Sequence, residues 1–173
     1  MVRIKKAALT VLVFTALLVF QGTSAGAAGR DAFSAGSTRL SVIIGNGYAF
    51  DDTYLVFGVG AAYFVADGLE VGLDFESWTG GNPGITKVSP RLGYVFNTAG
   101  ALKPYAGVFY RRTMIEGYDD LNSVGGRAGV YLMSGKGVYV GAGVVYESYL
   151  SCQTSIYASC NDTYPEIIVA VSF

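Results

Sequence analysis

The chain has 173 residues, enough for one domain, and only 14% of them are charged. It contains 24 glycines, 13 tyrosines and no histidine. This composition is typical of many short strands in which glycine and aromatic residues do much of the packing. The absence of histidine excludes Ser-His-Asp hydrolase chemistry and histidine-based metal sites.

The first 27 residues are expected to form a cleavable secretory signal. Arg3, Lys5 and Lys6 give a basic start, and residues 7–20 form an uncharged, largely apolar run that is too short for a good spanning helix. The sequence Ala-Gly-Ala at 25–27 fits the small-residue cleavage pattern. We therefore exclude residues 1–27 from the fold and expect residues 28–37 to be a flexible lead-in.

Removal of the signal makes the chain more acidic. Three of the 12 positive charges lie in the signal, which leaves nine against 13 acidic residues. An acidic chain without a basic run argues against nucleic-acid binding.

From residue 38 onward, apolar residues recur at every second position, which is typical of strands with two different faces. Eight segments show this pattern: 38–48, 53–66, 68–77, 85–96, 102–114, 123–133, 137–149 and 165–173. A segment of about ten residues with a tilt near 45° spans about 23 Å, close to the ~25 Å apolar band of outer-membrane barrels.

The connections between these segments alternate in length. Three are short, at 67–68, 97–101 and 134–136, whereas 78–84, 115–122 and 150–164 are longer and more polar. Only 49–52 breaks this trend by being short. Short turns at one end and longer loops at the other predict an all-β, eight-stranded antiparallel up-and-down transmembrane β-barrel over residues 38–173, with both termini at the short-turn end.

The less apolar faces of the strands carry ten charged residues, five of each sign: Arg39, Lys87, Arg91, Arg111 and Arg127, and Glu70, Asp74, Glu76, Glu147 and Glu166. Buried charges are tolerated when they are paired, and an eight-stranded lumen is just wide enough for side chains to fill it. We expect a salt-bridged network that plugs the lumen. General acid–base pairs are the less favoured interpretation, since catalysis needs an opening.

A soluble, lipocalin-type barrel would show the same alternation with its faces reversed. The less apolar faces are rich in glycine and carry few of the lysines and glutamates that a watery exterior would need. The apolar rows also end in aromatic residues, as in membrane girdles. Both features favour the membrane interpretation.

Several stretches resemble the small outer-membrane barrel family typified by the OmpA membrane domain and OmpX. They are LKPYAGVFY at 102–110, AGVYL at 128–132, GAGVVYE at 141–147 and the terminal Phe173. The resemblance implies a location in the bacterial outer membrane, with membrane lipid as surroundings. It also implies that the outer-membrane assembly machinery reads the last strand, with Phe173 as its signal. Known members range from membrane anchors and adhesins to lipid-modifying enzymes and small-solute channels.

We expect a non-enzymatic monomer without a cofactor that acts through its extracellular loops, in surface interaction or envelope integrity. The alternative is a narrow channel or carrier for small or apolar solutes, made possible by the many inward glycines. The loop sequences do not identify an extracellular ligand. Acidic pairs such as Asp119-Asp120 are interpreted as solvated loop charge rather than a metal site. Cys152 and Cys160 lie in the longest loop, and export permits a disulfide between them.

Overall fold

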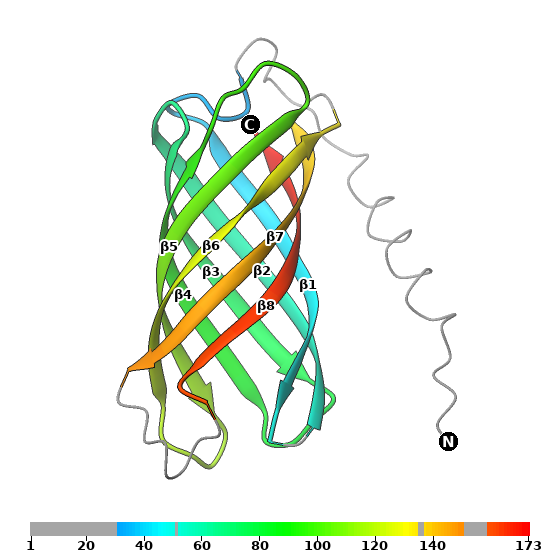
Figure 1. Cartoon of the computed structure of the whole chain (residues 1–173), viewed down its shortest axis with the longest axis vertical. Coiled ribbons are helices and arrows are strands. Elements are labelled where there is room, and N and C mark those ends of the chain that lie inside the picture. Colours follow the sequence, from blue (N-terminus) through cyan, green and yellow to red (C-terminus); the bar gives the residue numbers. More distant parts are fainter. Residues whose placement is uncertain (1–30, 51, 135–136, 151–158) are drawn as a thin grey trace, which may run out of the picture.

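The computed structural model describes residues 31–50, 52–134, 137–150 and 159–173. Eight strands form a closed barrel in which each strand pairs antiparallel with the next and β8 returns to β1 (Figure 1). The strands are β1 (Thr38–Ala49), β2 (Asp52–Ala66), β3 (Leu69–Thr79), β4 (Ile85–Val95), β5 (Leu102–Ile115), β6 (Leu121–Met133), β7 (Val138–Leu150) and β8 (Asn161–Ser172). The predicted fold class is therefore confirmed. The β2–β3, β4–β5 and β6–β7 connections lie at the upper end in Figure 1 and the other connections at the lower end. Their lengths separate less clearly than predicted, because the β4–β5 connection at the upper end, 96–101, is longer than the β3–β4 connection, 80–84, at the lower end.

The last strand begins at Asn161, four residues before the predicted segment. The first four residues of β8, 161–164, are mostly polar, so they show no alternation of apolar and polar positions. They nevertheless belong to the strand, because Asp162 pairs with Glu147 and Tyr164 pairs with Val145 on β7. Pairing with the neighbouring strand extends β8 where hydrophobic periodicity gives no signal.

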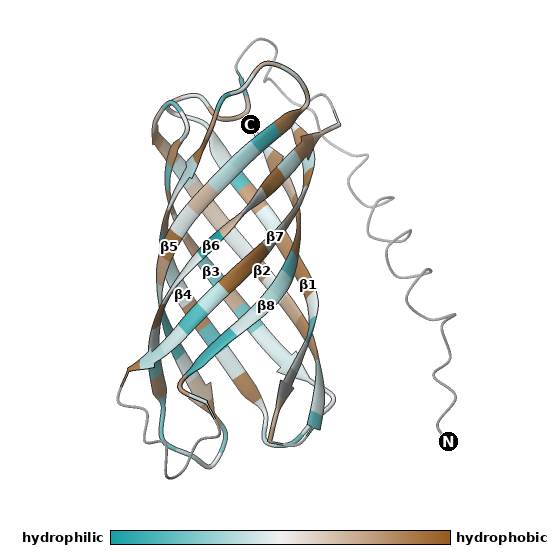
Figure 2. Cartoon of the chain, in the orientation of Figure 1, coloured by the Kyte–Doolittle hydropathy of each residue, from teal (hydrophilic) through white to brown (hydrophobic). Residues whose placement is uncertain are grey.

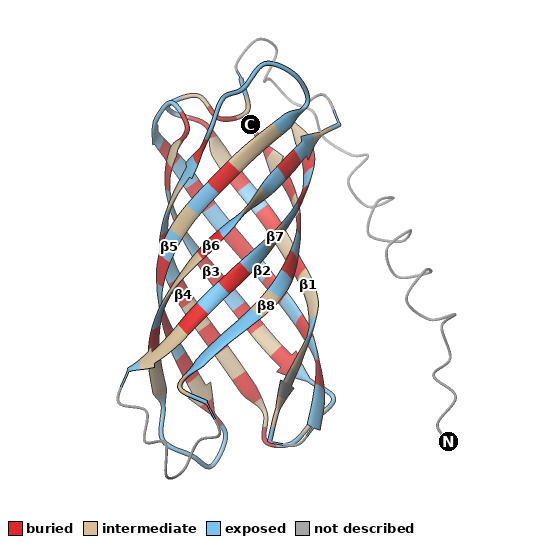
Figure 3. Cartoon of the chain, viewed as in Figure 1, coloured by how far each residue is buried: buried red, intermediate tan, exposed pale blue. Residues whose placement is uncertain are grey.

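The two faces of the barrel wall differ sharply. Figure 2 shows apolar residues alternating with polar ones along the strands, and Figure 3 shows the matching alternation of exposed and buried positions. Apolar side chains such as Leu73, Val108 and Ile167 point outward and are 53–60% exposed. A soluble ligand-binding barrel would turn these rows inward, so the arrangement is that of a barrel surrounded by lipid. In the described part of the chain, no helix is long and apolar enough to cross a membrane.

Residues 31–37 close the short-turn end of the barrel. The small, polar sequence of 28–37 predicts a flexible lead-in with no role for Phe33. In the structure Phe33 is 2% exposed, and its ring packs 5.8 Å from Phe64 and 5.1 Å from Tyr139 between centroids. Its carbonyl accepts a hydrogen bond from the Gly68 amide at 2.8 Å, which ties this segment to the β2–β3 turn. One aromatic residue in a small, polar stretch was too weak a signal to predict this contact.

Two expectations concern residues outside the described ranges. The signal at 1–27 is one of them, and Cys152 is the other. Cys160 lies directly before β8, and its carbonyl accepts a hydrogen bond from the Tyr149 amide at 2.9 Å. The disulfide between Cys152 and Cys160 stays a prediction.

Candidate functional site

All ten charged side chains singled out in the sequence point into the barrel, and none is more than 8% exposed. They come from every strand except β2. The inward face of β2 carries Gly58 and Gly60 instead, and these glycines leave room for Glu76 and Asp74 on β3. A Cβ atom at Gly58 would lie 3.0 Å from Cγ of Glu76. Charged side chains from every strand except β2 therefore point into the lumen.

One charged cluster lies at the middle of the lumen. The Arg39 Nη2 atom is 2.6 Å from Oε1 of Glu70, and Arg91 also contacts Glu70. The Nε atom of Arg91 donates to Oδ1 of Asp74 at 3.0 Å. Three strands, β1, β3 and β4, are tied together by these contacts.

Arg127 extends this cluster to the other side of the barrel. Its Nη1 atom lies 3.2 Å from Oδ2 of Asp74 on β3 and 3.6 Å from Oε2 of Glu166 on β8. Glu166 also accepts a hydrogen bond of 3.1 Å from the Tyr105 hydroxyl. The middle cluster, defined by Arg39, Glu70, Asp74, Arg91, Arg127 and Glu166, thus crosses the full width of the lumen.

A second charged cluster lies nearer the long loops and centres on Arg111. Its Nη2 atom is 2.8 Å from Oε1 of Glu76, and its Nη1 atom is 2.7 Å from Oε2 of Glu147. The Nε atom donates to the Ser89 hydroxyl at 2.7 Å. The Tyr164 hydroxyl donates to Oε2 of Glu147 at 2.9 Å. Every donor nitrogen of Arg111 is engaged, as a buried guanidinium requires.

Lys87 is the exception among the ten. No carboxylate of the described residues lies within 4.0 Å of it. Its ammonium instead sits 3.8 Å from the ring centroid of Trp78, a cation–π contact. Trp78 in turn donates from Nε1 to Oε2 of Glu76 at 3.4 Å. Lys87 therefore joins the second cluster through an aromatic ring.

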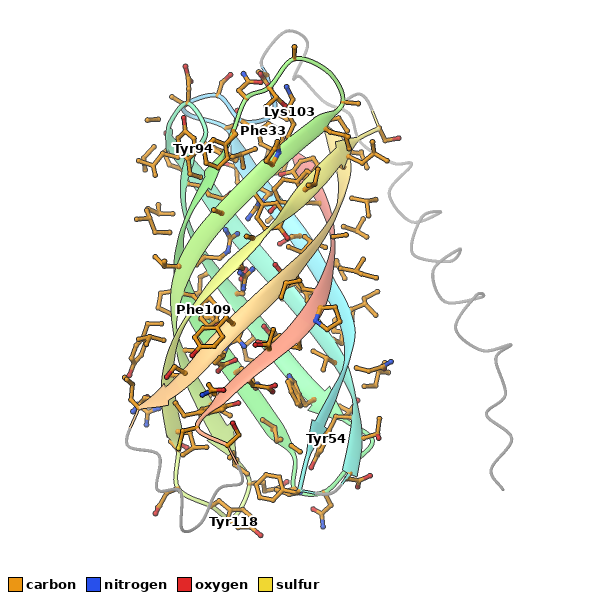
Figure 4. The ribbon with its side chains drawn as sticks, viewed as in Figure 1. Phe33, Tyr54, Tyr94, Lys103, Phe109 and Tyr118 are labelled. Atoms are coloured by element: carbon orange, nitrogen blue, oxygen red, sulfur yellow. The ribbon has the colours of Figure 1, made fainter. Side chains whose placement is uncertain are left out.

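Aromatic residues also lie inside the barrel, although the sequence pattern alone indicates no role for them. Phe109 lies between the two clusters, with Cζ of Arg111 4.6 Å and Cζ of Arg127 5.4 Å from its ring centroid (Figure 4). Toward the short turns, Tyr105 stacks on Tyr131 at 4.2 Å between centroids. The Tyr131 hydroxyl accepts a 2.7 Å hydrogen bond from Nη1 of Arg39, which joins the aromatic layer to the middle cluster.

The inward glycines lie beneath these rings. A Cβ atom at Gly141 would lie 2.6 Å from Cδ1 of Tyr131, and one at Gly129 would lie 2.6 Å from the Tyr105 hydroxyl. The alternation of glycine with tyrosine on β5, β6 and β7 was the signal that could have found this packing. Gly129 and Gly141 therefore accommodate aromatic side chains.

Beyond the second cluster, toward the long loops at the lower end in Figure 1, the lumen opens into a cavity of about 430 Å³, here called the outer cavity. Its walls include Gly45, Val56, Trp78, Val145, Tyr164 and Glu166. Elsewhere in the described ranges, no group of three or more Cys, Asp or Glu side chains is arranged to hold a metal ion.

A closed barrel whose strands expose apolar side chains outward and pack charges inward defines an integral outer-membrane β-barrel, because only a closed sheet satisfies its backbone within lipid. The apolar outer belt is that of a barrel surrounded by lipid, and a location in the bacterial outer membrane is that of the structural neighbours. Solved structures support the fold. The N-terminal barrel domain of OprF from Pseudomonas aeruginosa is similar with a TM-score of 0.62 and 16% identity, over 80% of this chain and 98% of that one.

Neisserial surface protein A (NspA) is similar with a TM-score of 0.55 and 15% identity, over 79% of this chain and 94% of the other. No protein-family model matches the chain, and no curated protein sequence matches it significantly. The fold is thus that of the small eight-stranded outer-membrane barrels, as the sequence resemblance implied.

Proposed function

We propose that the protein is a non-enzymatic, monomeric outer-membrane barrel whose lumen is closed by its charged clusters. The observation that carries this proposal is the continuous chain of contacts across the lumen, from Arg39 through Asp74 to Glu166 and, one layer further out, around Arg111. Nine of the ten charges take part in these ion pairs, and the tenth, Lys87, lies against the Trp78 ring. The absence of histidine and the mutual engagement of the buried carboxylates support a structural rather than a catalytic role for them.

The protein would act through its long loops, in surface interaction or envelope integrity. The described loop residues form a packed platform. The Tyr54 hydroxyl donates to the carbonyl of Pro83 at 3.0 Å, and the rings of Phe50 and Tyr118 lie 5.1 Å apart. Tyr118 is 61% exposed and lies at the lower end of the barrel in Figure 4. Exposed aromatic residues on a supported platform are typical of binding surfaces.

Conductance in planar bilayers tests the closed lumen. We expect the purified barrel to show no steady single-channel conductance. A steady conductance that disappears on substitution of Arg91 or Arg127 would contradict the closed lumen. It would favour the alternative function, a narrow channel or carrier, which is supported by the cavity of about 430 Å³.

Loop function is tested in cells that lack the protein. The measurements are adhesion of the cells to host or matrix proteins and their resistance to detergent. A Phe50→Ser, Tyr118→Ser double variant should insert normally but should fail to restore either property. Val108→Ala, on the lipid face, serves as the control. Full restoration by the loop variant would contradict a role for this platform.

A further inference from the structure

The seam between β1 and β8 is closed along only half of its length. Pairing between these strands runs from Arg39↔Ser172 to Ile44↔Ile167 and goes no further. On their other edges, β1 stays paired with β2 up to Ala49, and β8 stays paired with β7 down to Asn161. The two strands diverge toward the lower end in Figure 1. Residues 45–49 and 161–166 therefore face each other across the seam without a ladder.

Proline explains where the ladder stops. Thr38 and Phe173 exchange both backbone hydrogen bonds, at 2.8 and 3.0 Å. In an antiparallel pair such doubly bonded positions recur at every second residue. Continuing the register from Ile44↔Ile167, the next doubly bonded pair would join Asn46 to Pro165. Proline has no N–H to donate, so this pair cannot form both of its bonds.

The next donor on the same edge of β8 is also unavailable. By the same alternation the amide of Thr163 faces β1, but it donates to Oδ1 of Asp162 at 2.8 Å. Two successive donors of β8 are thus removed from the seam, one by proline and one by a carboxylate. The opening is built into the sequence of this strand.

The outer cavity lies directly behind this opening. Gly45 and Glu166 line it from the two sides of the seam, and Val56, Trp78 and Val145 form apolar walls. No atom lies within 4 Å of the position that a Cβ atom at Gly45 would take. Arg111 at the inner end of the cavity is already paired with Glu76, so this end carries compensated charge. A volume of about 430 Å³ lies within the ~300–1,000 Å³ range of small-molecule sites.

The inner end of the opening borders the apolar belt, whereas the outward positions further along it, Asn46 and Thr163, are polar and exposed. On the strands beside it, Phe57 pairs with Ile44 and Val144 pairs with Pro165, and both side chains point outward and are about half exposed. These outward residues belong to the apolar belt. Unpaired backbone groups in contact with hydrocarbon cost several kcal/mol each, so an occupant that covers the inner end of the opening would be favoured.

We propose that the β1–β8 seam is a lateral binding site for the acyl chain of an outer-leaflet lipid. The chain enters between Gly45 and Glu166 and lies against Val56 and Trp78, and its polar linkage meets the unpaired backbone at Asn46. A peptide strand fits less well, because Pro165 and the engaged Thr163 amide leave the β8 edge without the donors that strand addition requires. A charged solute fits less well because Arg111, Glu76 and Glu166 in the cavity wall are already in ion pairs.

Trp78 provides the test, because it is the single tryptophan of the chain and lies in the cavity wall. The full-length mature barrel is refolded into phosphatidylcholine vesicles whose acyl chains carry bromine, which quenches tryptophan only on contact. We expect tryptophan emission to fall relative to vesicles of unbrominated lipid, although Trp78 points inward and is 8% exposed.

Two variants should remove this quenching. Gly45→Leu fills the open space in the cavity, and Pro165→Val restores the N–H that lets the ladder continue. Gly126→Leu, a glycine substitution on the lipid face of β6, is the control and should keep the quenching. Heat-modifiable migration on a gel verifies that each variant has folded. Unchanged emission in brominated vesicles would overturn the proposal, as would equal quenching in the Gly45→Leu variant or quenching only by the aqueous quencher iodide. The result is independent of conductance, so the lateral site and the closed lumen can fail separately.

Discussion

Arg111 on β5 and Glu147 on β7 form an ion pair of 2.7 Å inside the barrel, although β6 lies between their strands in the wall. The same guanidinium reaches Glu76 on β3 at 2.8 Å, on its other side. Neighbouring strands are already joined by backbone hydrogen bonds. This arginine therefore adds cross-links between strands that do not touch in the sheet, and it fixes the cross-section of the barrel.

Arg111→Ala should destabilise the barrel by about 3–5 kcal/mol, because it leaves two buried carboxylates without their partner. The measurement is urea unfolding of the refolded protein in detergent micelles. The adjacent Arg112 gives a matched control. It pairs with Asp120 at 2.6 Å, but its side chain is 61% exposed, and such surface pairs contribute little to stability. Equal losses for the two variants would contradict a structural role for the lumen cluster.

Phe33→Ala should open the short-turn end of the barrel. Full burial of this ring against Phe64 and Tyr139 predicts a loss of about 3 kcal/mol or more, from lost contacts and the cavity left behind. Hydrogen exchange at the Gly68 amide, which donates to the Phe33 carbonyl, should also accelerate. Phe96→Ala removes a ring of equal size that is 48% exposed on the outer face and should leave this exchange rate unchanged. Protection of Gly68 that is the same in all three proteins would show that the segment does not dock.

Gly141→Ala should be destabilising, since its Cβ atom would lie 2.6 Å from the ring of Tyr131, which is itself held by stacking on Tyr105. Gly126→Ala should have the opposite sign. The nearest atom to its Cβ is 3.6 Å away, and replacing glycine lowers the entropy of the unfolded chain, worth about 0.4–1 kcal/mol. Paired unfolding curves of the two variants measure both effects. Similar shifts would mean that Tyr131 moves aside freely.

The strands and their faces were predictable because period-2 alternation depends only on which side of each residue meets lipid. The same alternation placed Arg39, Arg111 and Glu166 in the lumen. It could not tell which charges would pair, since partners such as Arg111 and Glu147 are 36 residues apart and meet across the interior. The seam was hidden for a different reason. Pro165 was recognised only as the start of the last segment, and its effect depends on the register of β8 against β1, which a single strand does not reveal.

The disulfide between Cys152 and Cys160 remains a prediction with a direct measurement. Alkylation of the unfolded protein without reductant should add no mass, and alkylation after reduction should add two groups. A loop this short should stabilise by about 2–3 kcal/mol in the chain-entropy account, so reduction should lower the unfolding midpoint modestly. Mass addition before reduction would show free thiols instead.

Removal of Phe173 should impair assembly in cells more than it impairs folding in detergent. Its side chain is 57% exposed and contributes nothing to the lumen, while its backbone exchanges two hydrogen bonds with Thr38. Loss of the residue therefore costs the barrel little packing but removes the terminal aromatic that the assembly machinery is expected to read. The truncated chain should refold from urea into micelles, as seen by heat-modifiable migration, yet accumulate outside the outer membrane when expressed. Phe173→Tyr keeps an aromatic ring at the same position and should assemble normally. If the truncated chain inserted in cells as well as the intact one, Phe173 would not be an assembly signal. If it failed equally in micelles, its role would be to hold the β1–β8 seam closed at the short-turn end.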